Sequence, residues 1–235
     1  MYQKTQMDTL FQPSATFVTP ELFRFLQELH RHNDREWFNA NKERYLIHVR
    51  DPLLEFVTVI APRLRAISPH IVADPRPSGG SLLRIYRDTR FSRDKKPYKT
   101  NAALSLGLGA RKDVEGPRYY LHLEPGEVFM GAGMWRPSPD ALSAIRESIV
   151  RNPRGWRRAK RSGLSHGESV LKRPPRGFDA AHPLIEDLKR TSFTTGREFT
   201  ERQACSSEFP AVFVRACRRE APLMGFLASA MGLSF

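Results

Sequence analysis

The chain has 235 residues, of which 40% are hydrophobic and 10% aromatic, and its 38 Lys/Arg outnumber its 25 Asp/Glu, for a formal net charge of +13. This composition favours a packed globular protein and excludes a disordered polyelectrolyte. No apolar run approaches the roughly 20 residues of a membrane-spanning helix, and Met1–Gln12 lacks the apolar core of a signal peptide. We therefore expect a cytoplasmic protein without a membrane partner, in which Cys205 and Cys217 are reduced thiols.

The first third of the chain predicts helices that follow a flexible tail over residues 1–15. Apolar side chains recur at helical spacing after Pro20. A second helix is expected to start at Asn33, whose side chain would cap it while Glu36 reaches back, as in a capping box. Pro52 suits the first position of a third helix.

The middle of the chain changes to the alternating pattern of strands. Strands are predicted over Ser81–Asp88, Ala102–Leu108, Tyr119–Glu124 and Glu127–Met134, and the last two are joined by the turn Pro125-Gly126. Short connections favour antiparallel pairing.

The last third returns to helical spacing. Helices are expected over Asp140–Val150, from Asn152, and over Ser207–Met231, with Pro222 breaking the last one into two pieces. Ser169–Asp187 is rich in proline and predicts an extended loop.

These elements predict one α+β domain over residues 16–235. Its central, mainly antiparallel sheet is expected to be packed by helices from the N-terminal and C-terminal thirds. We find neither an internal repeat nor a clear linker.

The positive charge is concentrated in two segments. Residues 84–99 hold seven Lys/Arg and two Asp, and residues 151–176 hold nine Lys/Arg and one Glu, so the two segments account for the whole net charge of +13. Charge held in two segments predicts a positive face that attracts phosphate or carboxylate groups.

The first basic segment offers a candidate binding site. Arg84, Tyr86 and Asp88 alternate along the predicted strand, so they would share a face and could converge on an anionic ligand. Basic side chains of the following loop, Phe91–Asn101, could grip a phosphate beside Tyr98. The alternative is a solvent-facing strand and a hydrated loop, in which the acids and bases pair with each other.

Tyr120, His122 and Glu124 share one face of a later predicted strand. A histidine beside a carboxylate is a reasonable acid–base pair near neutral pH. The alternative is a hydrogen-bonded histidine that only supports the sheet.

The predicted hairpin also places a hollow on that face. With a tight turn, His122 lies opposite Phe129 and Tyr120 lies opposite Gly131. Because Gly131 and Gly133 carry no side chain, their strand leaves room on the face that bears the histidine.

No metal site is expected. His30 and His32 are two residues apart at a helix end, where their side chains point in different directions. The two cysteines lack partner ligands at metal spacing. The chain also lacks the glycine-rich phosphate-loop and dinucleotide-binding patterns.

Five long stretches of the chain match a known pattern: Asn33–Lys42, Arg84–Lys99, Tyr120–Gly126, Gly131–Pro137 and Leu171–Phe178. They resemble the widespread bacterial family DUF2461, and the likeness runs from about Phe17 to near the C-terminus. Asp34 departs from the pattern, which commonly has a second asparagine there. The family name denotes a domain of unknown function, so the resemblance implies a shared fold and a shared site but supplies no activity, cofactor or substrate.

We expect one sheet face and the loop Phe91–Asn101 to form a basic cleft for a phosphate- or carboxylate-bearing ligand, closed by a proline-stiffened loop from the second basic segment. The candidate ligand-binding residues are Arg84, Tyr86, Arg87, Arg90, Lys95, Tyr98, Lys99, Lys172, Arg173 and Arg176. The candidates for proton transfer are Asp88, His122 and Glu124.

Three functions are compatible with such a protein. The first is an enzyme on a small phosphorylated or nucleotide-like substrate, and the second is a nucleic-acid-binding protein. The third is a non-catalytic protein that binds a protein partner or has a structural role. The sequence names neither the anionic partner nor an oligomeric state.

Overall fold

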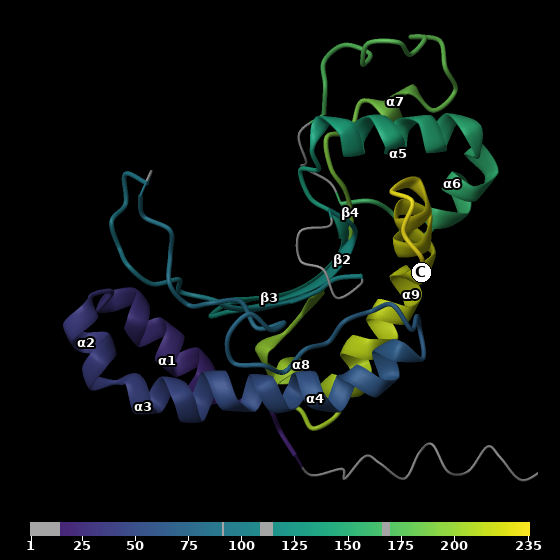
Figure 1. Ribbon diagram of the computed structural model, residues 1–235. Helices are drawn as coiled ribbons and strands as arrows, with labels where there is room; N and C mark the ends of the chain where they lie inside the picture. The colour runs from purple at the N-terminus through teal and green to yellow at the C-terminus, as the bar shows by residue number, and fades with distance from the viewer. Residues whose placement is uncertain (1–14, 91, 109–114, 166–169) are drawn as a thin grey trace, which may run out of the picture.

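The computed structural model describes residues 15–90, 92–108, 115–165 and 170–235, and it has the predicted α+β architecture (Figure 1). A four-stranded antiparallel sheet carries helices from both ends of the chain. The flexible tail predicted for residues 1–15 lies, except for Ala15, outside the described residues.

The N-terminal helices are α1 (Pro20–Arg31), α2 (Arg35–Ala40), α3 (Lys42–Tyr45), the π-helical turn η1 (Leu46–Arg50) and α4 (Asp51–Arg65). The expected cap of the second helix is wrong by one residue. Asp34, not Asn33, accepts the hydrogen bond from the Trp37 N–H, at 2.8 Å. Asn33 is used instead to hold a distant segment, through its two hydrogen bonds to the backbone of Tyr98.

The sheet has the strand order β1 (Ala102–Leu106), β2 (Arg118–Glu124), β3 (Glu127–Met134) and β4 (Phe193–Phe199). The hairpin through Pro125-Gly126 is as predicted, and Gly126 adopts the positive φ of 82° that such a turn favours. The fourth strand was not predicted.

The strand expected over Ser81–Asp88 is wrong. Only isolated bridges form there, Leu82 with Leu104 and Tyr86 with Tyr98. Tyr98 and Leu104 are two positions further apart in the chain than Leu82 and Tyr86, so the second segment is longer between the two bridges. This extra length breaks the alternation, as in a bulge, and Leu83 is 37% exposed.

The C-terminal helices are α5 (Pro139–Arg151), α6 (Pro153–Ala159), α7 (Ile185–Leu188), α8 (Glu201–Ala204) and α9 (Phe209–Ala230). Contrary to expectation, α9 continues through Pro222, which is exposed. The helix packs against α4, α6 and β3, and this tertiary packing offsets the cost of an internal proline. Within the described residues, no helix is long and apolar enough to cross a bilayer.

One face of the sheet is buried and the other is open. The buried face packs on α1, α4 and α9; in Figure 1, α1 and α4 lie below the sheet and α9 rises along its side towards α6. A second apolar cluster joins α5 and α6 to the last turns of α9 around the buried Trp156. These helices form a lobe at one end of the sheet, beside its open face (Figure 1). The open face is therefore the part of the sheet that is available for a ligand.

Candidate functional site

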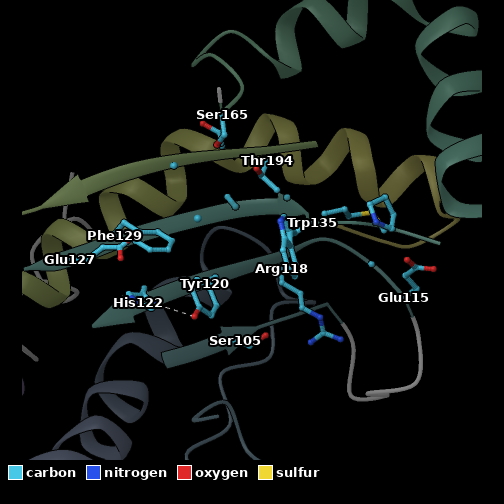
Figure 2. Close-up of a pocket in the computed structure, with 18 residues that line it drawn as sticks. Ser105, Glu115, Arg118, Tyr120, His122, Glu127, Phe129, Trp135, Ser165 and Thr194 are labelled. Atoms are coloured by element: carbon cyan, nitrogen blue, oxygen red, sulfur yellow. Dashed lines mark hydrogen bonds between the residues drawn. The ribbon is translucent and has the colours of Figure 1, made fainter. Parts of the chain in front are cut away.

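A cavity of about 880 Å³ lies on the open face of the sheet (Figure 2). Strands β2, β3 and β4 form its floor, and the segments around Glu115, Trp135 and Ser165 form its far end. Its lining side chains include Arg118, Tyr120, His122, Glu127, Phe129 and Trp135. Aromatic rings and glycines supply much of the wall, and charged or polar side chains lie among them.

The alternation along β2 puts its polar side chains on the open face, where Arg118, Tyr120 and His122 line the cavity. Tyr119, Leu121 and Leu123 are fully buried on the core face, so Tyr120, His122 and Glu124 must face the other side. The predicted register is confirmed, because His122 lies opposite Phe129 and Tyr120 opposite Gly131. The acid–base candidates predicted on β2 thus share the open face.

Two glycines make the cavity possible, for different reasons. At Gly131 a Cβ would meet only Thr195 O and Tyr120 Cβ, both at 3.9 Å, which is ordinary contact distance. At Gly133 the φ angle is 124° and a Cβ would clash with the Phe193 carbonyl. Gly133 is therefore required by the backbone, whereas Gly131 only leaves space.

His122 is held by hydrogen bonds through both ring nitrogens. Its Nε2 lies 3.2 Å from Oε2 of Glu124, and its Nδ1 lies 3.1 Å from the Tyr120 hydroxyl and 3.4 Å from Nδ2 of Asn101. The second oxygen of Glu124, Oε1, accepts a hydrogen bond of 2.7 Å from the Thr100 hydroxyl. These contacts fix the direction in which Nε2 and Oε2 point.

The imidazole of His122 also contacts an aromatic ring, and its partner Tyr120 has a shifted pKa. The imidazole stacks on Phe129, with ring centroids 4.8 Å apart and an interplanar angle of 14°. Burial raises the pKa of the Tyr120 phenol, and the negative charges of Glu124 and Glu127 raise it further. Tyr120 therefore keeps its proton, and its hydroxyl can donate to Nδ1 of the histidine or accept from it, according to the tautomer of the ring.

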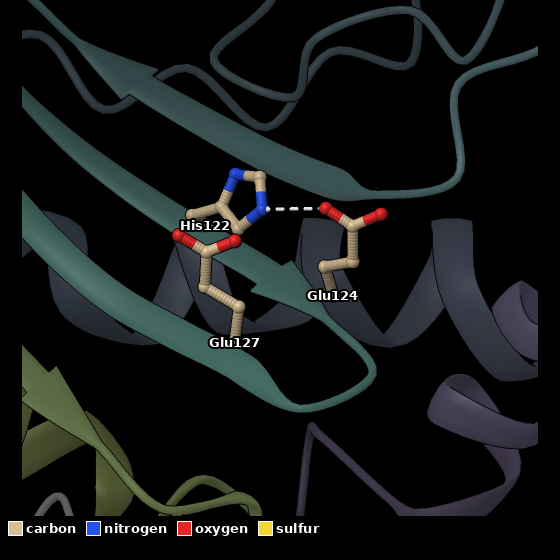
Figure 3. A group of neighbouring side chains, drawn as sticks. All are labelled: His122, Glu124 and Glu127. Atoms are coloured by element: carbon tan, nitrogen blue, oxygen red, sulfur yellow. Dashed lines mark hydrogen bonds and ion pairs between the residues drawn. The ribbon is translucent and has the colours of Figure 1, made fainter.

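Glu127 completes a group of three at this end of the cavity (Figure 3). It is paired with Glu124 across the hairpin, and one ligand-type atom each from His122, Glu124 and Glu127 lie within 4.8 Å of one another. The sequence predicted no metal site, because neither His30 and His32 nor the two cysteines have partner ligands at metal spacing. The three side chains can act either as an acid–base group or as metal ligands.

The opposite end of the cavity carries a guanidinium. Arg118 is half-buried, and it lies over Gly107, where a Cβ would come within 2.7 Å of its Nη1. No hydrogen bond or ion pair of this guanidinium exists within the described parts of the chain. An arginine that has no partner among the described residues, in a mainly apolar cavity, is suited to bind an anion.

Trp135 stands at the rim beside this arginine (Figure 2). It is 70% exposed, and the Arg136 guanidinium lies over its ring, 4.7 Å from the centroid. Arg136 has a φ of 48°, which is rare for a residue other than glycine, and its N–H donates to the Ser192 hydroxyl at 2.9 Å. The backbone is thus strained at the position that presents the tryptophan.

The comparison with protein families agrees with these motifs. The model of DUF2461, described as a conserved hypothetical protein, matches residues 21–226. The chain belongs to the DUF2461 family. No curated protein and no solved structure matches it, so the site of this DUF2461 protein has to be interpreted from its own geometry.

Most of the first basic segment is held by its own neighbours. Arg87 pairs with Asp94 at 2.6 Å and Arg90 with Asp88 at 2.7 Å. Lys95 donates to the Thr89 carbonyl. These cations are engaged in an exposed loop, which is the alternative that we considered for this segment.

Asp88 does not join the other acid–base candidates in this DUF2461 protein. The hydrogen bond from Arg90 lowers the pKa of Asp88, which lies in the exposed loop and does not line the cavity. Tyr98 is buried and stacks on Phe38 with centroids 4.1 Å apart, so its ring supports the core. Tyr86 is 51% exposed beside it, and Phe91 is outside the described residues.

Two further cations of this segment, Arg84 and Lys99, do not line the cavity. Lys99 directly precedes Thr100 and Asn101, which contact Glu124 and His122. Burial, and next the positive charge of Arg84, lower the pKa of Lys99.

The second basic segment lies elsewhere. Lys172, Arg173 and Arg176 are exposed in the loop that is tied to α7 by the Leu171 N–H to Lys189 carbonyl hydrogen bond. In Figure 1 this loop stands above α5, away from residues 84–99, which project beyond the other end of the sheet. The structure thus does not bring the two basic segments together around one ligand.

Sequence reasoning missed Arg118, Glu127 and Trp135 as site residues. The signal for Arg118 was present, because it is two residues before Tyr120 and continues the same face of β2. Glu127 follows from the hairpin register. Trp135 had no such signal, since its position depends on the strained turn after β3.

Proposed function

We propose that this protein binds a small molecule that carries a flat ring and one carboxylate or phosphate group, and that His122 and Glu124 form the reactive end of the site. The observation that carries the proposal is the Arg118 guanidinium, which has no hydrogen bond or ion pair with any of the described residues and lies in the same cavity as the histidine. The anionic group of the ligand would bind Arg118, and the rest of the ligand would then lie along the floor of the cavity, towards His122.

The size and lining of the cavity support a ring-bearing ligand. A volume of about 880 Å³ lies in the range of about 300–1,000 Å³ that is typical of small-molecule sites. Tyr120, Phe129 and the exposed Trp135 supply aromatic surface on which a flat ring can stack. A single guanidinium suits one anionic group rather than a polyanion.

The distribution of positive charge favours a small molecule over a nucleic acid. Arg87 and Arg90 already pair with acids of their own loop. The exposed cations Lys172 and Arg173 lie on a loop distant from that segment (Figure 1). A continuous basic groove, which single strands or duplexes need, is therefore not supported by these two segments.

Binding of simple aromatic anions tests the proposal. Benzoate and phenyl phosphate are the anionic probes, benzamide is the neutral one, and binding is followed by saturation-transfer NMR. We expect dissociation constants on the order of 1 mM for the anions and binding at least about tenfold weaker for benzamide, because one charge-assisted hydrogen-bond pair is lost.

The variant Arg118→Gln should abolish the preference for the anions. Arg154→Gln is the matched control, because Arg154 is exposed on α6 and does not line this cavity. Equal binding of benzoate and benzamide to the wild-type protein, or an unchanged preference in Arg118→Gln, would refute the proposed site.

A further inference from the structure

We propose that His122, Glu124 and Glu127 bind a divalent transition-metal ion at the hairpin end of the cavity (Figure 3). The ion site goes beyond the proposed function, because it does not depend on which ring-bearing anion occupies the rest of the cavity. A bound ion would supply a Lewis acid at the reactive end of the site.

The hairpin brings the three ligands together through its register. Glu124 and Glu127 flank the two-residue turn and are paired directly opposite each other. His122 precedes Glu124 by two residues and therefore points to the same face of the sheet. A one-residue change in this tight turn would separate the three side chains.

The distances fit coordination. Metal–ligand bonds of about 2.0–2.2 Å at tetrahedral or octahedral angles put neighbouring ligand atoms roughly 2.8–3.6 Å apart. His122 Nε2 and Glu124 Oε2 are 3.2 Å apart, whereas a charge-assisted N–H···O bond is usually about 2.7–2.9 Å. Glu127 is exposed, so a small side-chain rotation brings its carboxylate from within 4.8 Å to bonding distance.

Groups outside the trio orient two of the ligands. A metal-bound histidine normally donates a hydrogen bond through its other ring nitrogen; with Nε2 of His122 on the ion, Nδ1 would carry the ring proton and donate to the Tyr120 hydroxyl oxygen, 3.1 Å away. Glu124 is held in the same way, because its Oε1 accepts from the Thr100 hydroxyl at 2.7 Å. Both contacts leave the opposite atoms, Nε2 and Oε2, directed to one point.

The charges around the trio also point to a cation. Two carboxylates face each other across the hairpin, and within the described residues neither Glu124 nor Glu127 has an ion pair with a lysine or arginine. This is unusual in a chain that has 38 Lys/Arg for 25 Asp/Glu. A bound divalent cation would neutralise the repulsion between the two carboxylates.

The donor set selects the class of ion. One imidazole nitrogen with two carboxylate oxygens suits Mn²⁺, Fe²⁺, Co²⁺ or Zn²⁺, whereas Mg²⁺ and Ca²⁺ favour ligands that are all oxygen. Three protein ligands leave coordination positions for water or for an oxygen atom of the ligand in the cavity. The ion would thus lie at the end of the cavity opposite Arg118 (Figure 2).

Titration of the purified protein with Co²⁺, followed by its visible absorption, tests the site directly. We expect one equivalent of Co²⁺ to bind and to give absorption bands of a nitrogen- and oxygen-ligated ion, with competition by Zn²⁺ and little competition by Mg²⁺. Glu127→Gln should weaken binding at least about tenfold, and it should fold normally because Glu127 is exposed at the turn. Thr100→Ala should also weaken binding, by about tenfold.

The control is Glu198→Gln. Glu198 is exposed on β4 opposite Phe129 and carries the same charge on the same face of the sheet, but it is not part of the trio. Absence of Co²⁺ binding to the wild-type protein, or equal weakening in Glu127→Gln and Glu198→Gln, would overturn the proposal. Co²⁺ binding without any binding of aromatic anions would refute the proposed function and leave the metal site intact.

Discussion

Gly131 lies directly opposite Tyr120 in the β2–β3 ladder, so the space beside the Tyr120 ring on the open face belongs to the cavity. A Cβ at this position meets its nearest neighbours at 3.9 Å, and the position therefore accepts a side chain. Glycine inside a strand stabilises the strand less than a β-branched residue does. The glycine thus lowers the stability of the strand while it keeps the cavity open.

Gly131→Val should stabilise the protein and abolish ligand binding. We expect an increase of roughly 0.5–1 kcal/mol in the free energy of unfolding, or about 1–4 °C in Tm for a chain of this size. Binding of benzoate and phenyl phosphate should be lost, because the valine side chain occupies the cavity. Thermal denaturation and NMR binding on the same sample measure both effects. A destabilised variant that still binds the probes would contradict the role assigned to Gly131.

Gly133→Ala should have the opposite effect on stability. The φ angle of 124° and the clash of a Cβ with the Phe193 carbonyl force β3 and β4 apart. We expect a loss of at least about 2–3 kcal/mol in urea denaturation, from backbone strain and broken strand pairing. Gly131→Ala is the matched control and should change stability by less than about 1 kcal/mol. Equal effects of the two alanines would show that Gly133 is not strained.

The β2–β3 hairpin could be predicted because its signals are local. Strict alternation on both strands and the Pro125-Gly126 turn together determine the register. Tyr120, His122 and Glu124 could therefore be placed on one face from the sequence alone. β4 lacks such a signal, because Arg197 and its neighbours on either side are all exposed and Gly196 interrupts the alternation.

Charge density was a poor guide to the site. The excess of lysine and arginine in residues 84–99 does not show that Arg87 pairs with Asp94 and Arg90 with Asp88. Whether a cation is paired depends on side-chain geometry, which composition does not contain. Arg118 lies outside both basic segments and has no such partner within the described residues, and it became visible only through its position on the open face.

The contact between Asn33 and Tyr98 should stabilise the fold by holding the first basic segment, residues 84–99, against the N-terminal helices. The Asn33 amide donates to the Tyr98 carbonyl and accepts from the Tyr98 N–H, both at 3.0 Å. Asn33→Ala leaves both backbone groups without this partner and should cost about 1–3 kcal/mol of unfolding free energy. Asn33→Asp should cost at least as much, because a carboxylate cannot donate to the carbonyl.

Urea denaturation of both variants measures this effect. Asn39→Ala is the control, since Asn39 is exposed on α2, and it should leave stability unchanged or slightly higher. Hydrogen exchange at the Tyr98 amide should be faster in Asn33→Ala than in Asn39→Ala. Unchanged stability and exchange in Asn33→Ala would show that the Phe38–Tyr98 stacking alone holds the segment.

Tyr45 should make stability decrease in alkaline solution. Its ring packs against Phe25 and Phe38, and burial is the main cause that raises the pKa of its phenol to about 12. The folded state therefore holds the phenolic proton more tightly than the unfolded state, in which the pKa is about 10. The stabilisation is fully present below pH 10, and it is lost as the pH rises from 10 through 12. The shift corresponds to roughly 2–3 kcal/mol.

Comparison with Tyr45→Phe isolates this effect from other alkaline titrations. Within the described residues the Tyr45 hydroxyl has no hydrogen bond, so the variant should be about as stable as the wild type at pH 8. Urea denaturation at pH 8, 10 and 11.5 should show the wild type losing roughly 2 kcal/mol more than Tyr45→Phe over this range. A difference between the two proteins that stays constant with pH would mean that the phenol is solvated and ionises freely in the folded state.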